Sequence, residues 1–483
     1  MDNGINLVDA YTSLRAMSYA PYTTMSAMAE LVDNSIQAKA SYVALIAQDI
    51  KGRTAKGSEV KYLDKLAVYD NGMGMNAETI ANALAVGFSR NKEDKKGYIK
   101  LGNERVVEAR LRDAEFFWQK DKSKNLVKRV SKLKSINYFK GLGTYFDKVQ
   151  RMRKLGGMLS DNLMISKDKV ELSASVCKVD LVSELVGEFP ELQGIMGGYF
   201  ANAQGFDKEI SLAISEQYLP IGFNSKIPKK PYSIALSLSD KLDTLVGFFG
   251  INMKPSSSRD PYALRRLALG VIRTIIENKK NFKIKDLINY TSNLYSDQGF
   301  EFKNESLQKE LSDFLMERLK FYMKEEKIRH DIIQASINSF NIDQCTVIFG
   351  KAKSLNKIIN KQNGIDIISS YKRAFNILEN ELKHENIELS NTTDPGIFKT
   401  EFEKNLFKKI NNLKKYFLSI DKDENFEESL NKLAELKKIV FEFFDNVVVN
   451  EEDQDLKKNR LELIQMLCKT FDNYVNFSLI DSR

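Results

Sequence analysis

The sequence predicts a multidomain, mainly α-helical protein whose N-terminal residues form a separate α+β part. Apolar residues recur at three- and four-residue steps between Val176 and Val186, as they do on the buried face of a helix. A helical pattern at residues 25–38 is followed by the strand-like residues 66–70, which indicates the α+β start. The same helical spacing predicts a C-terminal bundle from two stripes: Tyr371, Phe375 and Leu378, and Leu430, Leu433, Leu436 and Val440.

Composition excludes several functional classes. A chain with 43% hydrophobic and 29% charged residues is typical of a globular protein. No run approaches the ~20 apolar residues that a membrane span requires, and no signal pattern opens the chain, so we expect a cytoplasmic protein without a membrane partner. With His330 and His384 as the two histidines, a histidine-rich metal site is disfavoured. The net charge of +8 is compatible with a polyanionic partner but identifies none.

Three helices are expected in the middle of the chain. The first starts at Val176 and ends before Pro190, because proline offers no amide and displaces its neighbour from the α region. The second opens at Ser239, a favourable N-cap residue. Residues 256–260 form a polar turn, and Pro261 is expected at the first position of the third helix.

Three strings in this region carry a resemblance. EFPELQGIMG at residues 188–197, SDKLDTLVGFF at 239–249 and KPSSSRDPYALRRLALGVIR at 254–273 closely resemble the β subunit of bacterial glycyl-tRNA synthetase. We extend the resemblance over residues 103–483. It implies tRNA recognition for the ATP-dependent charging of tRNA(Gly) with glycine, in an α₂β₂ tetramer whose α subunit forms the adenylate. This chain is then a non-catalytic subunit of a ligase.

Residues 103–280 resemble the all-α HD-like region of that subunit, and an active HD centre needs histidine and aspartate ligands. Asp180, Asp240 and Asp243 lie in the span from 171 to 277, which contains no histidine, so we expect them to cap and pair within the fold. Arg265 and Arg266, after Arg259 in the third string, are candidates for tRNA phosphates. The alternative is that these arginines pair with neighbouring acids such as Asp260.

Residues 281–364 are expected to form a helical connector, and residues 365–483 resemble the all-α DALR anticodon-binding bundle. That resemblance rests on residues 443–449 and 456–461. It makes Lys457, Lys458 and Arg460 candidates for phosphate contacts and Asn459 a candidate for a base contact. The alternative places these residues on a solvated helix face.

Residues 1–102 resemble a different family, the GHKL ATPases (gyrase, Hsp90, histidine kinase and MutL type), on ELVDN at 30–34 and DNGMG at 70–74. The resemblance implies that Glu30 polarises the attacking water and Asn34 holds Mg²⁺ beside ATP. It also implies that Asp70 accepts the adenine amino group and that Gly72 and Gly74 admit the nucleotide close to the backbone. The i, i+4 spacing of Glu30 and Asn34 puts both side chains on one helix face.

The GHKL resemblance is incomplete. Residues 97–102 resemble the first part of a second glycine box. The sequence then changes at residue 103 to the synthetase-like pattern. A truncated domain lacks part of the amide cradle for phosphates, so we expect weak ATP binding at most. Residues 140–144, KGLGT, lack the full P-loop pattern and are expected to be a turn. Two other functions stay open: a GHKL-type ATP-binding protein or ATPase with a C-terminal binding scaffold, and an inactive fusion.

Overall fold

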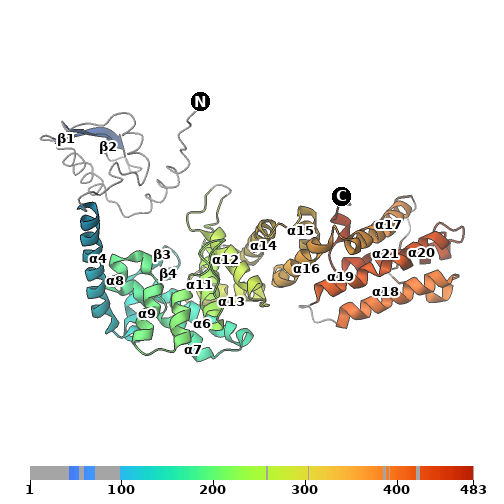
Figure 1. The fold of residues 1–483 in the computed structure, drawn as a ribbon, viewed down its shortest axis with the longest axis horizontal. Helices are drawn as coiled ribbons and strands as arrows, with labels where there is room; N and C mark the ends of the chain where they lie inside the picture. The colour runs from blue at the N-terminus through green and yellow to red at the C-terminus, as the bar shows by residue number, and fades with distance from the viewer. Residues whose placement is uncertain are drawn as a thin grey trace. The chain divides into compact units, whose positions relative to one another are not determined.

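The computed structural model describes residues 43–53, 59–70, 98–256, 259–302, 304–384, 388–390, 392–419 and 425–481, with side chains from residue 108 onward. The chain divides into two compact units, Met1–Arg112 and Asp113–Arg483. The described residues are predominantly helical (Figure 1), which confirms the mainly α fold class. Within them, no helix is long and apolar enough to cross a membrane.

The first unit contains an antiparallel hairpin of β1 (Val43–Arg53) and β2 (Glu59–Asp70), with Val43 opposite Asp70. Its register shifts between Gln48 and Asp49. The strand expected at residues 66–70 is confirmed, and Asp70 is its last residue. Glu30, Asn34, Gly72 and Gly74 lie outside the described residues.

Helix α4 (Tyr98–Lys122) includes residues 98–102 of the expected glycine box. Its first-turn amides, at residues 98–101, have no carbonyl partner within the helix, so their part in binding a phosphate stays a prediction. The run Tyr-Ile-Lys-Leu contains residues that tolerate a helix well, and the glycine at 102 costs only about 1 kcal/mol relative to alanine.

The second unit continues with α5 (Leu126–Arg129), η1 (Val130–Ser135), β3 (Asn137–Phe139) and β4 (Gly143–Thr144). Residues 140–144 form the expected turn, which joins these two short strands. Gly141 and Gly143 have φ of 88° and 83°, a conformation that glycine adopts without strain. Thr144 and Asp147 then form a capping box at the start of α6 (Tyr145–Leu163).

The helix expected from Val176 to residue 189 is wrong as a single element. Helix α7 (Lys167–Val176) ends where it was expected to begin, and η2 (Val179–Val182), α8 (Glu184–Glu188) and η3 (Pro190–Leu192) follow. Ser183 causes the break, because its extended backbone ends η2 while its hydroxyl caps the Val186 amide at 3.1 Å. Helices α9 (Ile195–Ala203) and α10 (Lys208–Glu216) complete this segment.

Helix α11 (Pro231–Gly250) is the buried centre of this region, with all but two of its residues buried. It begins eight positions before the expected Ser239, because Pro231 supplies the start and Ser239 donates back to the Ala235 carbonyl at 2.7 Å. Pro261 was expected at the first position of the third helix, which is wrong: α12 (Leu264–Glu277) begins three residues later, with Ala263 as its N-cap residue. The carboxylate of Asp260 accepts the amides of Leu264 and Arg265, each at 2.9 Å, and so fixes that start.

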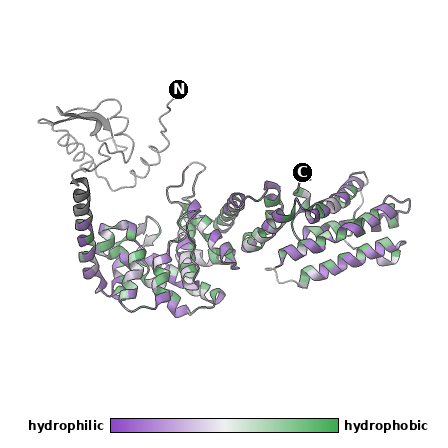
Figure 2. Cartoon of the chain, in the orientation of Figure 1, coloured by the Kyte–Doolittle hydropathy of each residue, from purple (hydrophilic) through white to green (hydrophobic). Residues whose placement is uncertain are grey.

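The remaining elements are helical throughout. They are α13 (Ile284–Asp297), α14 (Leu307–Glu325), α15 (His330–Ile337), η4 (Ile342–Gln344), α16 (Cys345–Ile358), α17 (Gln362–His384), η5 (Pro395–Ile397), α18 (Glu401–Ser419), α19 (Phe426–Ala434), α20 (Leu436–Asn446), α21 (Gln454–Asp472) and η6 (Phe477–Leu479). Hydrophobic and hydrophilic residues alternate along these helices (Figure 2), as expected for a packed bundle. Both predicted C-terminal stripes pack into or against the core, which confirms the bundle.

Candidate functional site

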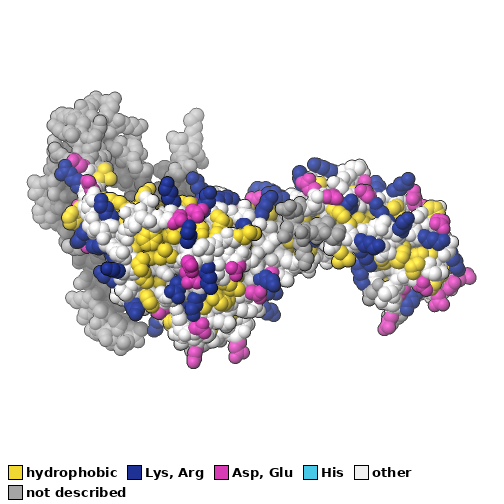
Figure 3. All heavy atoms as spheres, turned by 90° about the horizontal axis from the view of Figure 1, so that it is seen from below, with side chains coloured by type: hydrophobic (Ala, Val, Ile, Leu, Met, Phe, Trp, Pro, Cys, Tyr) yellow, Lys and Arg dark blue, Asp and Glu magenta, His cyan; other side chains and the backbone are white. Residues whose placement is uncertain are grey.

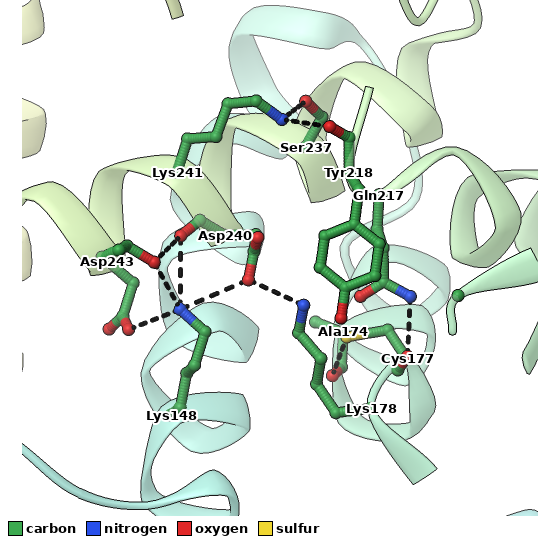
Figure 4. A network of polar contacts seen from close by, with 12 residues as sticks. Lys148, Ala174, Cys177, Lys178, Gln217, Tyr218, Ser237, Asp240, Lys241 and Asp243 are labelled. Carbon is green, nitrogen blue, oxygen red and sulfur yellow. Dashed lines mark hydrogen bonds and ion pairs between the residues drawn. The ribbon is translucent and has the colours of Figure 1, made fainter. Parts of the chain in front are cut away.

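Buried charges connect helices α6 and α11 to the segment between α7 and η2 (Figure 4). The ammonium of Lys148 on α6 lies 3.1 Å from Asp243 and 3.3 Å from Asp240, both on α11. Lys178 reaches the same Asp240 oxygen at 2.8 Å. Arg151, one turn after Lys148, donates from Nε to Asp243 at 2.6 Å. These five side chains form what we call the buried charge cluster.

The cluster is almost sealed from water, since its five residues are at most 7% exposed. Burial disfavours any lone charge, so each ion depends on its partners. Burial acts to raise the pKa of Asp240, but the ammonium groups of Lys148 and Lys178 outweigh it and hold that pKa well below its usual range. The stability of each ion in the buried charge cluster therefore depends on the other ions.

The acids of the HD-like region are thus engaged inside the fold, as predicted. Asp180, the third of them, accepts the Gly194 amide at 2.5 Å, and the nearby charge of Lys178 acts to lower its pKa. Burial raises its pKa to about 6, against the lowering effect of the Gly194 amide. Within the described residues, no group of three or more His, Cys, Asp and Glu side chains is arranged to hold a metal ion.

Of the four residues on α21 that were predicted to contact RNA, three have their side chains buried inside the C-terminal bundle. On α21, Arg460 donates to Glu403 at 2.8 Å and to Glu451 at 3.0 Å, and Lys457 pairs with Glu381 at 3.0 Å. Lys457, Asn459 and Arg460 are all at most 4% exposed. Asn459 exchanges two hydrogen bonds with the backbone of Asp394, at 2.8 and 3.0 Å.

This geometry corrects the expectation for Lys457, Asn459 and Arg460. A cation that is buried and paired has no face open to an RNA phosphate, and a solvated helix face is equally wrong for these residues. The pattern of basic residues could not show this, because their acidic partners lie on α17, on α18 and in the segment after α20.

Lys458 differs from its neighbours, because it is only partly buried and borders a hollow of about 300 Å³ at the start of α21. The hydroxyl-rich residues before η5 form the opposite wall, and the Thr393 hydroxyl is buried without a hydrogen-bond partner. Sequence reasoning missed this hollow, although three hydroxyl residues within 390–393 could have indicated it. Its lining is Ser390, Thr392, Thr393, Asp394, Ile397, Asp455, Lys458, Asn459 and Glu462.

The arginines of the central region keep their side chains away from Asp260. That carboxylate caps α12, so the predicted pairing alternative is wrong for it. Arg265 donates instead to the Ser256 carbonyl, and Arg266 is exposed. On the face seen in Figure 3, Lys and Arg side chains are scattered among Asp and Glu, so net charge alone marks no single site.

Comparison with known proteins decides the family. A model of the glycyl-tRNA synthetase beta subunit matches residues 76–338, more than half of the chain. The chain belongs to this family. The DALR anticodon binding domain matches residues 367–480, and the histidine kinase-, DNA gyrase B- and HSP90-like ATPase domain matches residues 22–105. These matches confirm the three resemblances stated from the sequence.

Members of the family from distant bacteria are similar to this chain over the same extent. The glycine–tRNA ligase beta subunit of Rickettsia conorii is 38% identical over 378 residues, which is 78% of this chain and 54% of the relative. That of Thermodesulfovibrio yellowstonii is 34% identical over 391 residues, 81% of this chain and 55% of the relative. The chain therefore spans about half the length of the curated relatives it matches.

Proposed function

We propose that this chain acts as the tRNA-recognition part of a glycine–tRNA ligase β subunit. It serves the ATP-dependent charging of tRNA(Gly) in the cytoplasm, together with an α subunit that forms the adenylate. The assembly is an α₂β₂ tetramer, and ATP is used with Mg²⁺. None of the described residues is assigned a catalytic role.

One observation supports this function most directly. The residues that match the DALR anticodon binding domain form a helical bundle, and Lys458 stands at the rim of the hollow at the start of α21. Hydroxyl and carboxylate groups around the hollow can hydrogen-bond the exposed edges of an unpaired base, while the ammonium of Lys458 can contact its phosphate.

The test is filter binding of the full chain to tRNA(Gly) and to an unrelated tRNA across a salt series. We expect selective binding that Lys458→Gln weakens about three- to tenfold, with a shallower salt dependence, because one phosphate contact is lost. Lys438→Gln, at an 83% exposed side chain on α20, is the matched control and should change little. Equal binding of both tRNAs by the wild-type chain would refute the proposal.

The partnership with an α subunit is tested separately. Co-expression of this chain with a tagged α subunit should give a complex that elutes as a single species. Its mass by light scattering should correspond to two copies of each chain. Recovery of the chain alone, with the α subunit well folded, would contradict this part of the proposal.

A second function, ATP binding by the N-terminal unit, is favoured by the ATPase match at residues 22–105. Glu30, Asn34 with Mg²⁺, Asp70, Gly72 and Gly74 are the proposed site residues. The resemblance covers only the first part of the second glycine box, so the proposed phosphate cradle is incomplete. Titration with a fluorescent ATP analogue should therefore give weak binding that Asp70→Ala abolishes. Binding unaffected by that change would remove the second function.

A further inference from the structure

A run of basic residues without any acid follows helix α4. Residues 122–146 contain six lysines, one arginine and no Asp or Glu, so they carry a charge of +7, against +8 for the whole chain. The run includes α5, η1 and the β3–β4 hairpin. Positive and negative residues nearly balance in the rest of the chain, so the excess charge is concentrated in this one segment.

The fold turns three of these lysines toward solvent. Helix α5 continues into η1 without a break, and residues three apart share a face of a 3₁₀ helix. One face of η1 carries Val130, which packs against the core, and Leu133, which is fully buried. Lys132 and Lys134 lie on the two other faces, and Lys128 precedes them in α5. All three lysines are exposed, and we call them the lysine surface.

The lysine surface has no carboxylate partner within the described residues. Elements α5, α6, η2 and β4 pack against η1, and their acids are Asp147, Asp161 and Asp180. Asp147 caps the start of α6, Asp161 lies in the last turn of α6, and Asp180 is buried. An exposed lysine elsewhere, Lys438 on α20, has Glu442 one turn away. The lysine surface therefore keeps its charge open to an external anion.

The spacing of the lysines suits an extended polyanion. Lys128 and Lys134 are six residues apart, which separates their backbones by about 10 Å along the helix axis. A nucleic-acid strand offers several phosphates over that length. The ammonium of Lys134 lies 4.7 Å from the ring centre of Phe146, which holds it in place without neutralising it.

The surroundings favour a nucleic acid over a lipid surface. Among residues 122–146, all of which the structure describes, Val127 is the one large apolar residue that is exposed. A helix that lies on a membrane needs an apolar face to enter the lipid, and this segment buries its apolar face in the core.

We propose that Lys128, Lys132 and Lys134 bind the phosphate backbone of RNA, separately from the hollow beside Lys458. The inference rests on the proposed function, because the RNA is the same tRNA. Phosphate contacts position a nucleic acid and carry no sequence information. The lysine surface therefore adds affinity for any tRNA and leaves selectivity to the C-terminal bundle.

The experiment measures binding of tRNA(Gly) and of an unrelated tRNA to the full chain across a salt series. A triple variant with Lys128→Gln, Lys132→Gln and Lys134→Gln should bind both RNAs about 30-fold more weakly at low salt. Its salt slope should fall by about two to three, and the ratio of the two affinities should stay at the wild-type value. The matching triple arginine variant should keep wild-type affinity, because arginine also neutralises phosphate.

A control variant removes the same number of charges from other exposed sites. Lys167→Gln, Lys353→Gln and Lys438→Gln together change side chains that are 67%, 62% and 83% exposed, and each has an acidic partner. This variant should bind both RNAs nearly as the wild type does. Both triple glutamine variants should unfold at the wild-type urea concentration, because their substitutions are on the surface.

The outcomes separate this inference from the proposed function. If the lysine-surface variant binds both tRNAs like the control while Lys458→Gln loses affinity, the lysine surface is refuted and the proposed function stands. A changed ratio of affinities would also refute it. Undiminished tRNA binding with lost co-sedimentation on phosphatidylserine vesicles would assign the lysines to a membrane instead. If the wild-type chain shows no selectivity for tRNA(Gly), the proposed function itself has failed.

Discussion

The buried charge cluster and the paired side chains of the C-terminal bundle solve the same problem in different ways. In the cluster, Lys148 and Lys178 share one carboxylate, Asp240, and Lys148 also reaches Asp243. In the bundle, Lys457 and Arg460 each have acids of their own. Loss of one group therefore affects several others in the cluster, whereas loss of a cation in the bundle affects only that cation's own acids.

The comparison also separates charges that hold the fold from charges available to a ligand. Glu403, the partner of Arg460, is fully buried, whereas Glu451 is 40% exposed at its side chain. The pairs of the bundle are thus closer to water than those of the cluster. Lys458, which is only partly buried at the rim of the hollow, is available to an external anion.

The largest effect is expected for Asp243→Ala. The change leaves Arg151 without its carboxylate and Lys148 with only Asp240, inside a region closed to water. The free energy of unfolding should fall by about 3–5 kcal/mol in urea titrations. Asp297→Ala, which removes an exposed partner of Lys154, should change it by less than about 0.5 kcal/mol.

A second change in the cluster sharpens this prediction. Arg151→Met in the Asp243→Ala background removes one stranded cation and should recover part of the lost stability. If the double variant is as unstable as the sum of both single variants, the two residues do not depend on each other and the account of the cluster is wrong.

Substitutions in the C-terminal bundle should lower the free energy of unfolding by less than those in the buried charge cluster. Arg460→Ala strands the buried Glu403, and we expect a loss of about 2–3 kcal/mol in the free energy of unfolding. Replacing both partners, as Arg460→Met with Glu403→Leu, should restore most of it. The double variant should also bind tRNA like the wild type, because Arg460 is held inside the protein. A folded double variant that has lost tRNA affinity would contradict this structural role.

Local patterns in the sequence predicted what depends on neighbours along the chain. The apolar stripes that begin at Tyr371 and Leu430 predicted the C-terminal bundle, and residues 66–70 predicted the end of β2. The absence of histidine from residues 171–277 correctly implied that Asp240 and Asp243 pair within the fold. Motif strings predicted the family, and the matches confirm it.

Features that depend on distant residues could not be predicted. Ser239 looked like a helix start, but a buried helix satisfies a serine by a bond to the carbonyl one turn earlier. Lys457 and Arg460 looked like a basic surface because their acids, Glu381 and Glu403, lie 76 and 57 positions earlier in the sequence.

The smallest effect concerns Asp180 and Asp472, two carboxylates that form no ion pair within the described residues. Burial raises the pKa of Asp180 to about 6 beside the cluster, and that of Asp472 to about 6 in the bundle. A carboxyl whose pKa is higher in the folded state stabilises the fold when protonated. This contribution is complete below about pH 4, the ordinary aspartate value, and is lost as the pH rises through 6.

Asp180→Asn removes this dependence because its amide does not titrate. Between pH 4 and pH 7, wild-type stability should fall relative to that of Asp180→Asn by about 2 kcal/mol, measured by urea unfolding at each pH. Asp472→Asn should show the same sign with a smaller change, since Asp472 is less buried than Asp180 and accepts the Phe477 amide at 3.1 Å. A difference that is constant with pH would mean that Asp180 stays ionised in the folded protein. Its amide partner at Gly194 would then be sufficient to replace the lysines that Asp240 requires.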